Sequence, residues 1–302
     1  MAEALAWLAD PWPLAGAVSP GSAQRGAGSL PPGRWGRPDQ LALPLSDRGL
    51  LLADGLFETL LVENGRPRLL AEHLDRWRAS AALLGMAPPP PLEPLMPLLA
   101  EAVARSGISA GALRLNWTRG SAGPGSRGLD PAGPDAPPPA HRFWLQLTPW
   151  RPCFAPLAVI VSPTERRCAT SLLSRCKTFA YGAAIQARRQ AREAGADDAL
   201  LLGSDGTLCS GTVANLLLRQ GGHWLTPPLA SGCLPGVMRA RALASGLAQE
   251  AALSPDLLGG GAAACTALLI NSLGCRPLAR CQGRPLQPLS AREAEALWRS
   301  LL

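Results

Sequence analysis

Two stretches rich in glycine and proline limit where this chain of 302 residues can form helices and strands. They cover residues 17–38 and 120–140, and 11 of the 20 residues from 120 to 139 are glycine or proline. This composition favours loops or insertions over regular structure. Helices and strands are therefore expected between and after the two stretches. With 47% apolar residues, the remainder can still bury a large core.

The first half of the chain predicts a mixture of helices and strands. The segment FETLLVENGRPRLL reads as two strands around Asn64-Gly65, a dipeptide typical of tight hairpin turns. Apolar residues at helical spacing follow over 70–84, and Gly85 is expected to end that helix. Further elements are expected as a helix near 94–106 and strands near 112–118 and 142–148.

The second half opens with a strand in PLAVIVS and continues with a helix over 177–194. The stretch from Asp197 to Leu229 predicts an antiparallel meander, because turn signals divide its short apolar runs. A helix in LPGVMRARALASGLAQE, with Pro235 and Gly236 at its start, and a strand in CTALLINSL follow. The final helix is predicted by a capping box of Ser290 and Glu293.

Charge and composition exclude several classes of partner. The net charge of +7 comes from scattered cations and no nucleic-acid motif accompanies it, so no nucleic-acid partner is expected. No apolar run approaches the roughly 18 residues needed to cross a bilayer, and the first twenty residues make a poor secretory signal. The eight cysteines and three histidines lack metal-ligand spacing, so no metal is expected. These features predict a cytoplasmic protein with reduced thiols and a small anionic substrate.

A single lysine stands out in the composition. Lys177 is the only lysine among 29 basic residues, and Tyr181, four residues later, is the only tyrosine. Lysine can lose its proton and form an imine, whereas arginine cannot. Lys177 is therefore the candidate for imine chemistry, with chance survival of one lysine as the alternative. On a helix over 177–194, Lys177 and Tyr181 would share one face.

Two segments could bind an anion. Residues 123–128 match GxGxxG, but LDPAGPDAPPP follows them and cannot form the helix that a dinucleotide site requires. The predicted helix start at 236–239 is the better candidate, because free backbone N–H groups and the positive end of the helix dipole meet there. An imine-forming lysine, a nearby phenol and a phosphate-sized anion site are the parts of a pyridoxal phosphate pocket.

Several stretches resemble the class IV aminotransferase family, the fold-type IV pyridoxal phosphate enzymes. They follow the family's order between about residues 45 and 290, as ADGLFETLLVENGRPRLLAEHLDRW, CKTFAYGAAIQARR, GTVANLLL, GCLPGVMR and LLINSLGCRPL. The resemblance implies an α+β fold with a small N-terminal α/β domain over 1–151. It also implies a larger C-terminal domain over 152–302, built on an antiparallel meander or pseudobarrel. A homodimer with its pocket between the two domains is expected.

The resemblance also implies roles for individual residues. Lys177 is similar to the lysine that forms the Schiff base with pyridoxal 5'-phosphate and moves the proton. Arg76 in HLDRW matches the arginine that binds the cofactor phosphate, with a solvated helix face as the alternative. The other implied cofactor contacts are Tyr181, Ser210, Val237, Met238 and Ser272. Arg119 and Arg127 resemble cations for substrate carboxylates, although the insertion between them weakens that match.

Ser210 stands where the family has a glutamate, directly before the glycine of GTVANL. A carboxylate keeps the pyridine nitrogen of the cofactor protonated, and a hydroxyl does so far less well. Transamination depends on that protonated ring more than elimination does. Ser210, together with Met238 in GVMR, therefore favours elimination of the kind performed by the family's 4-amino-4-deoxychorismate lyases, which release pyruvate and 4-aminobenzoate for folate synthesis. The alternatives are branched-chain or D-amino-acid transamination, and cofactor binding with reduced or lost catalysis.

Overall fold

The computed structural model describes residues 3–10, 30–121, 129, 140–258 and 265–302. The chain forms two compact units, one of Met1–Arg151 with Lys177–Ala180 and the other of Pro152–Cys176 with Tyr181–Leu302. The short segment that contains the single lysine therefore belongs to the first unit, although it follows residue 151 in the sequence. No helix among the described residues is both long and apolar enough to cross a membrane.

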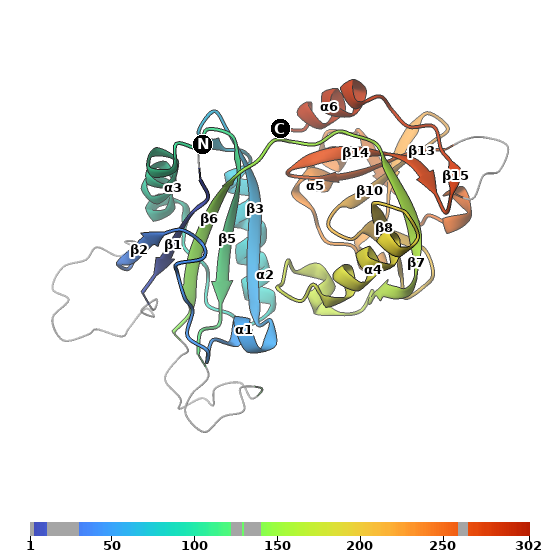
Figure 1. Ribbon diagram of the computed structural model, residues 1–302. Helices are drawn as coiled ribbons and strands as arrows, with labels where there is room; N and C mark the ends of the chain where they lie inside the picture. The colour runs from blue at the N-terminus through green and yellow to red at the C-terminus, as the bar shows by residue number, and fades with distance from the viewer. Residues whose placement is uncertain (1–2, 11–29, 122–128, 130–139, 259–264) are drawn as a thin grey trace. The chain divides into compact units, whose positions relative to one another are not determined.

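The first unit is built on one antiparallel sheet (Figure 1). Its six strands lie in the order β2-β1-β6-β5-β3-β4. Their bounds are β1 Leu5–Ala9, β2 Gly33–Gly36, β3 Gly55–Glu63, β4 Arg66–Pro67, β5 Gly111–Thr118 and β6 Arg142–Pro149. The predicted hairpin is confirmed, because Asn64 and Gly65 connect β3 to β4 with φ values of 52° and 71°.

Strand β2 corrects the expectation that all of 17–38 is loop. Gly33–Gly36 pairs with β1, and a Cβ atom built on Gly33 would lie 2.3 Å from the Trp7 ring. A glycine is needed there because the backbone passes so close to the indole. Gly33 therefore contributes to the loop-like composition, although the strand needs a glycine there because its backbone lies against the Trp7 ring.

Two helices pack on this sheet, α2 Leu70–Leu83 and α3 Leu92–Ser106, and both confirm predicted helices. The short helix α1 Arg48–Leu52 has no buried residue. The buried side of α2 carries Leu74, Trp77 and Ala81, each at most 1% exposed. Alternation along the strands turns apolar side chains such as Leu60 and Leu115 into this core.

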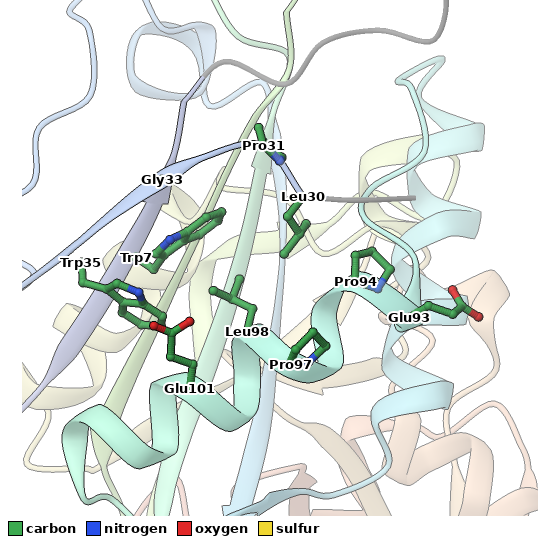
Figure 2. Close-up of a pocket in the computed structure, with 10 residues that line it drawn as sticks. All are labelled: Trp7, Leu30, Pro31, Gly33, Trp35, Glu93, Pro94, Pro97, Leu98 and Glu101. Atoms are coloured by element: carbon green, nitrogen blue, oxygen red, sulfur yellow. The ribbon is translucent and has the colours of Figure 1, made fainter. Parts of the chain in front are cut away.

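A groove of about 710 Å³ lies against α3 (Figure 2). Trp7 and Trp35 of the first two strands line it together with Pro94, Pro97 and Leu98 of the helix. It shares no lining residue with the site around Lys177 described below.

The second unit contains a nine-stranded sheet that closes on itself. Along its path the order is β12-β11-β10-β13-β14-β7-β8-β9, and β9 pairs back to β10 through Ser210 and Asn215. The bounds are β7 Leu157–Arg167, β8 Asp198–Gly203, β9 Leu208–Gly211, β10 Asn215–Gln220, β11 His223–Thr226, β12 Ala248–Glu250, β13 Thr266–Asn271, β14 Gly274–Cys281 and β15 Arg284–Pro285. The meander of β8 to β11 is antiparallel as predicted, whereas β7 runs parallel to β8 and to β14.

Three α-helices belong to this unit: α4 Gly182–Glu193, α5 Val237–Ala244 and α6 Ala291–Arg299. Single-turn 3₁₀ helices cover Leu172–Arg175, Leu229–Ser231 and Pro255–Leu258. The predicted capping box of α6 is confirmed. Helix α5 is shorter than expected, because Ala248–Glu250 pairs with β11 as a parallel strand instead of extending the helix.

Candidate functional site

Lys177 lies in a short extended segment that pairs with β3. The Phe57 N–H donates to the Lys177 carbonyl at 2.9 Å, and the Phe179 N–H donates to the Gly55 carbonyl at 3.1 Å. Helix α4 begins at Gly182 with Tyr181 as its N-cap, so the helix predicted from residue 177 is wrong in its first turn. Lys177 and Tyr181 therefore do not share a helical face. Hydrogen bonds to β3 replace the local helical ones.

The Lys177 side chain packs on an aromatic ring. Its Nζ atom lies 4.3 Å from the centroid of the Phe57 ring, and the guanidinium carbon of Arg114 lies 3.6 Å from the same centroid. Nε of Arg114 also donates to Oδ1 of Asn116 at 2.7 Å. Because aromatic faces attract cations, Phe57 fixes the position of both charged groups. No motif in the sequence predicted that Arg114 would pack on the same ring as Lys177.

Arg76 is held by a buried carboxylate on the strand next to it. Its Nε donates to Oε1 of Glu58 at 2.8 Å and its Nη2 donates to Oε2 at 2.5 Å. The same Oε2 accepts a hydrogen bond from Nδ1 of His73 at 2.7 Å. Glu58 and His73 are each 1% exposed and the Arg76 side chain is 11% exposed. Arg76 is therefore not on a solvated face of α2, which was the alternative reading of HLDRW.

The charges of this cluster follow from its geometry. Burial alone would raise the pKa of Glu58, but the charge of Arg76 and the hydrogen bond from His73 outweigh it and lower this pKa to about 2. Burial lowers the pKa of His73, and the charges of Arg76 and Lys177 lower it further, while Glu58 offsets them only in part. At neutral pH the cluster therefore holds an ionised Glu58, a charged Arg76 and a neutral His73 whose Nδ1–H faces the carboxylate.

Acid should weaken this ion pair. A carboxyl whose pKa falls from 4.5 to about 2 on folding contributes stability above pH 4.5 and loses it as the pH drops toward 2. At about 1.4 kcal/mol per pH unit the loss amounts to roughly 3 kcal/mol. We expect the difference in unfolding free energy between the wild-type protein and Glu58→Gln to shrink by about that amount between pH 5 and pH 2. Urea unfolding across that range measures it, and a constant difference would contradict the assignment.

In the second unit, the start of α5 is shaped for an anion. Gly236 is the N-cap and offers no side-chain cap to the first-turn N–H groups of Val237 and Met238. A Cβ atom built on Gly236 would lie 1.9 Å from Oδ1 of Asn215, whose Nδ2 donates to the Leu234 carbonyl at 2.9 Å. No larger residue could replace this glycine without displacing Asn215. The uncapped helix start therefore fits the phosphate of pyridoxal phosphate.

Ser210 is the penultimate residue of β9 and pairs with Asn215, the residue that approaches Gly236 at the start of α5. This pairing spans the turn to β10, and the Oγ of Ser210 donates to the Gly211 carbonyl at 2.9 Å. The acidic residue of the neighbouring strand, Asp198, accepts hydrogen bonds from Thr212 and pairs with Arg188. The Asp198 carboxylate is thus bound by a residue that follows β9 and by a residue of α4. The group that Ser210 itself offers at this point is a neutral hydroxyl.

Ser272 lies in the turn between β13 and β14 at the same end of the barrel. Nδ2 of Asn271 donates to the Val213 carbonyl at 3.3 Å, which ties this turn to the β9–β10 turn. The structure thus brings Ser210, Ser272 and the start of α5 together from three segments of the chain. Tyr181 is the N-cap residue of α4, and its role toward the cofactor stays a prediction.

Arg119 is held by three structural partners. Its Nε donates to Oδ2 of Asp54 at 2.9 Å, and its two Nη atoms donate to the carbonyls of Gly85 and Leu84, both at 2.8 Å. These bonds anchor the end of α2, and a role for Arg119 in binding substrate stays a prediction. Arg127 and the whole of the 123–128 motif lie outside the described residues, as does most of the insertion over 120–140.

Glu58 and His73 were absent from the sequence prediction, although two signals could have found them. His73 precedes Arg76 by three residues, so both side chains lie on one side of α2. Glu58 lies in β3, and the residues two positions before and after it, on the same face of the strand, are buried and apolar. A charged residue at such a position requires a partner.

Metal and disulfide chemistry have no support within the described part of the chain. No group of three His, Cys, Asp or Glu residues there could hold a metal ion. All eight cysteines are described and are free thiols.

Comparison with known families assigns this arrangement to a class. The model of the family described as amino-transferase class IV matches residues 55–281, which is most of the chain. The protein belongs to the class IV aminotransferase family, and its fold is that of the fold-type IV pyridoxal phosphate enzymes. Pyridoxal phosphate is the cofactor of this family. The lysine beside β3 and the uncapped start of α5 are consistent with it.

Named relatives differ in activity. A protein of Methanocaldococcus jannaschii, provisionally named a branched-chain-amino-acid aminotransferase, is 30% identical over 64% of this chain. That match spans 65% of the relative, so the chain covers just under two thirds of its length. A bifunctional aminodeoxychorismate lyase and D-amino acid transaminase of Mycobacterium tuberculosis is 27% identical over 64% of this chain and 68% of its own.

A solved structure from Legionella pneumophila covers more of the chain. It is provisionally named a 4-amino-4-deoxychorismate lyase and shares 25% identity with a TM-score of 0.75. The superposition covers 87% of this chain and 96% of the other. Lyase and aminotransferase names thus both occur among the relatives.

Proposed function

We propose that this protein is a 4-amino-4-deoxychorismate lyase, which splits its substrate into 4-aminobenzoate and pyruvate. The observation that carries the proposal is Ser210, a neutral hydroxyl at the position where the family has a glutamate. Its support comes from the hydrogen bond to Gly211 and from the engagement of Asp198 with Thr212 and Arg188. The Asp198 carboxylate is therefore bound by other residues, and Ser210 supplies a hydroxyl in place of a carboxylate.

Pyridoxal phosphate would supply an aldehyde that reacts with amines and a ring that withdraws electrons. Lys177 is proposed to be the amine that holds the cofactor, and its Nζ is proposed to take the proton from the substrate ring carbon that bears the amino group. The packing of Nζ on Phe57 supports this assignment, because it holds the amine at one place beside β3. Arg76, the start of α5 and Ser272 are each assigned to the cofactor phosphate.

We choose between the two reactions by how strongly each one depends on the cofactor ring to withdraw electrons. Elimination of pyruvate yields an aromatic product, so part of the driving force comes from the substrate. Transamination gains no aromatic ring, so it would depend more strongly on the electron-withdrawing ring of the cofactor. A hydroxyl stabilises the protonated pyridine nitrogen far less than a carboxylate does. Ser210 therefore suits elimination better.

Amino-acid transamination is the second candidate. The Methanocaldococcus jannaschii relative carries an aminotransferase name, and the Mycobacterium tuberculosis relative is named for both activities. A third candidate is cofactor binding with reduced or lost catalysis. The near-visible absorbance of the holoprotein distinguishes the third from the others, because it changes on adding substrate only when the substrate amine reaches the cofactor.

Replacing Ser210 with glutamate tests the electron-sink argument. We expect Ser210→Glu to raise the ratio of transamination to elimination by about tenfold, equivalent to about 1.4 kcal/mol of barrier difference. Both rates are measured on one preparation, as transfer of an amino group to 2-oxoglutarate and as release of pyruvate. A ratio that stays constant would contradict the role assigned to Ser210.

Ser210→Gln is the matched control, because glutamine has the size of glutamate without its charge. If bulk alone alters the ratio, the two variants behave alike. If charge decides, only Ser210→Glu shifts the ratio toward transamination.

A further inference from the structure

We propose that Glu58 and His73 are positioning residues that orient Arg76 toward the cofactor phosphate. The inference rests on the proposed phosphate role of Arg76 and adds the device that aims it. Neither residue is proposed to touch the cofactor. Their effect is exerted through the guanidinium.

The first argument is the geometry of the pair. Glu58 binds the edge of the guanidinium formed by Nε and Nη2, at 2.8 and 2.5 Å. A guanidinium is planar and carries five N–H groups in a fixed fork, so holding one edge determines the direction of the opposite edge. Two hydrogen bonds are needed for this, because one bond would leave the plane free to rotate.

The second argument is that the carboxylate is itself held. Oε2 of Glu58 accepts from His73 at 2.7 Å as well as from Arg76. Glu58 comes from β3, while His73 and Arg76 come from successive turns of α2. The packing of the helix on the strand and the three-residue spacing on the helix together fix the carboxylate from two sides.

The third argument concerns the cost of the arrangement. Burying an ion pair takes two charges out of water, and well-packed apolar residues are often as stabilising. Glu58 lies 1% exposed among apolar positions of β3 that could hold a leucine. Stability alone therefore does not account for a carboxylate at this position. A requirement for a guanidinium held in one orientation does account for it.

The test separates geometry from charge. Glu58→Asp keeps the negative charge but shortens the side chain by one methylene, so it cannot reach both nitrogens in the same way. Pyridoxal phosphate and pyridoxal are titrated into the apoprotein, and the ratio of their dissociation constants isolates the contribution of the phosphate. We expect Glu58→Asp to weaken pyridoxal phosphate binding about tenfold and to leave pyridoxal binding within about twofold.

His73 provides a second pair of variants. His73→Ala removes the donor to Oε2, whereas His73→Asn places a side-chain N–H near the former Nδ1. We expect His73→Ala to weaken the preference for the phosphorylated ligand about threefold and His73→Asn to restore it. If Glu58→Asp does not fold, as judged by its thermal unfolding, this pair decides the question with the same ratio.

The outcomes distinguish this inference from the site on which it rests. Equal weakening of both ligands, or no change in either, would show that Glu58 and His73 serve only the packing of α2 on β3. If Arg76→Ala lowers the preference for the phosphorylated ligand and Glu58→Asp does not, the positioning inference alone fails. If Arg76→Ala leaves the preference unchanged, the phosphate role of Arg76 fails with it.

Discussion

Lys177→Arg is expected to abolish turnover and the near-visible absorbance of the holoprotein. Arginine stays protonated and cannot condense with the aldehyde of the cofactor. No other lysine exists in the chain to take over, so we expect the rate to fall by at least about a thousandfold, or about 4 kcal/mol of barrier. The spectrum is recorded after the protein has been dialysed against buffer without cofactor.

We expect Lys177→Arg to leave the fold and its stability unchanged. Arginine keeps a positive charge that can lie over Phe57, and the two hydrogen bonds that join Lys177 and Phe179 to Phe57 and Gly55 of β3 connect backbone atoms, which the substitution leaves in place. Thermal unfolding of the variant should therefore match that of the wild-type protein. Absorbance that survives dialysis would end the assignment of Lys177.

Arg76→Ala is expected to weaken the binding of pyridoxal phosphate by about 1.5–3 kcal/mol, or roughly tenfold to 150-fold. The variant removes a charged donor to the phosphate and leaves Glu58 buried without its main counter-charge. Affinity is measured by titrating the apoprotein and following the absorbance.

Arg78→Ala is the matched control for this prediction. Arg78 lies on the same helix, is partly exposed and pairs with Asp75 on the surface. Its removal should leave cofactor affinity within about twofold, because exposed ion pairs contribute little. Equal affinity of Arg76→Ala and the wild-type protein would place the phosphate elsewhere.

Local sequence signals predicted the elements whose structure is decided locally. Asn64-Gly65 specified the hairpin turn, and Ser290 with Glu293 specified the start of α6. Elements that depend on distant partners were missed. Strand β2 pairs with β1, and β12 pairs in parallel with β11, so neither could be recognised without knowing its neighbour.

At the candidate site, too, local sequence signals were recognised and contacts between distant segments were missed. Lys177, Arg76 and Ser210 were found because composition and short motifs single them out. The extended backbone at Lys177 was missed because its hydrogen bonds go to β3, more than a hundred residues earlier in the chain. Glu58 and His73 became meaningful only once α2 was seen to pack on β3. The candidate residues could thus be chosen from the sequence, and their supporting contacts could not.

The central claim is tested most directly by the products of the unmodified protein. Holoprotein is incubated with 4-amino-4-deoxychorismate, and 4-aminobenzoate and pyruvate are quantified. The same preparation is given L- and D-amino acids with 2-oxoglutarate. We expect both elimination products in equal amounts, at a rate well above any amino-group transfer. Absence of 4-aminobenzoate, or transfer as fast as elimination, would contradict the lyase proposal and leave an aminotransferase in its place.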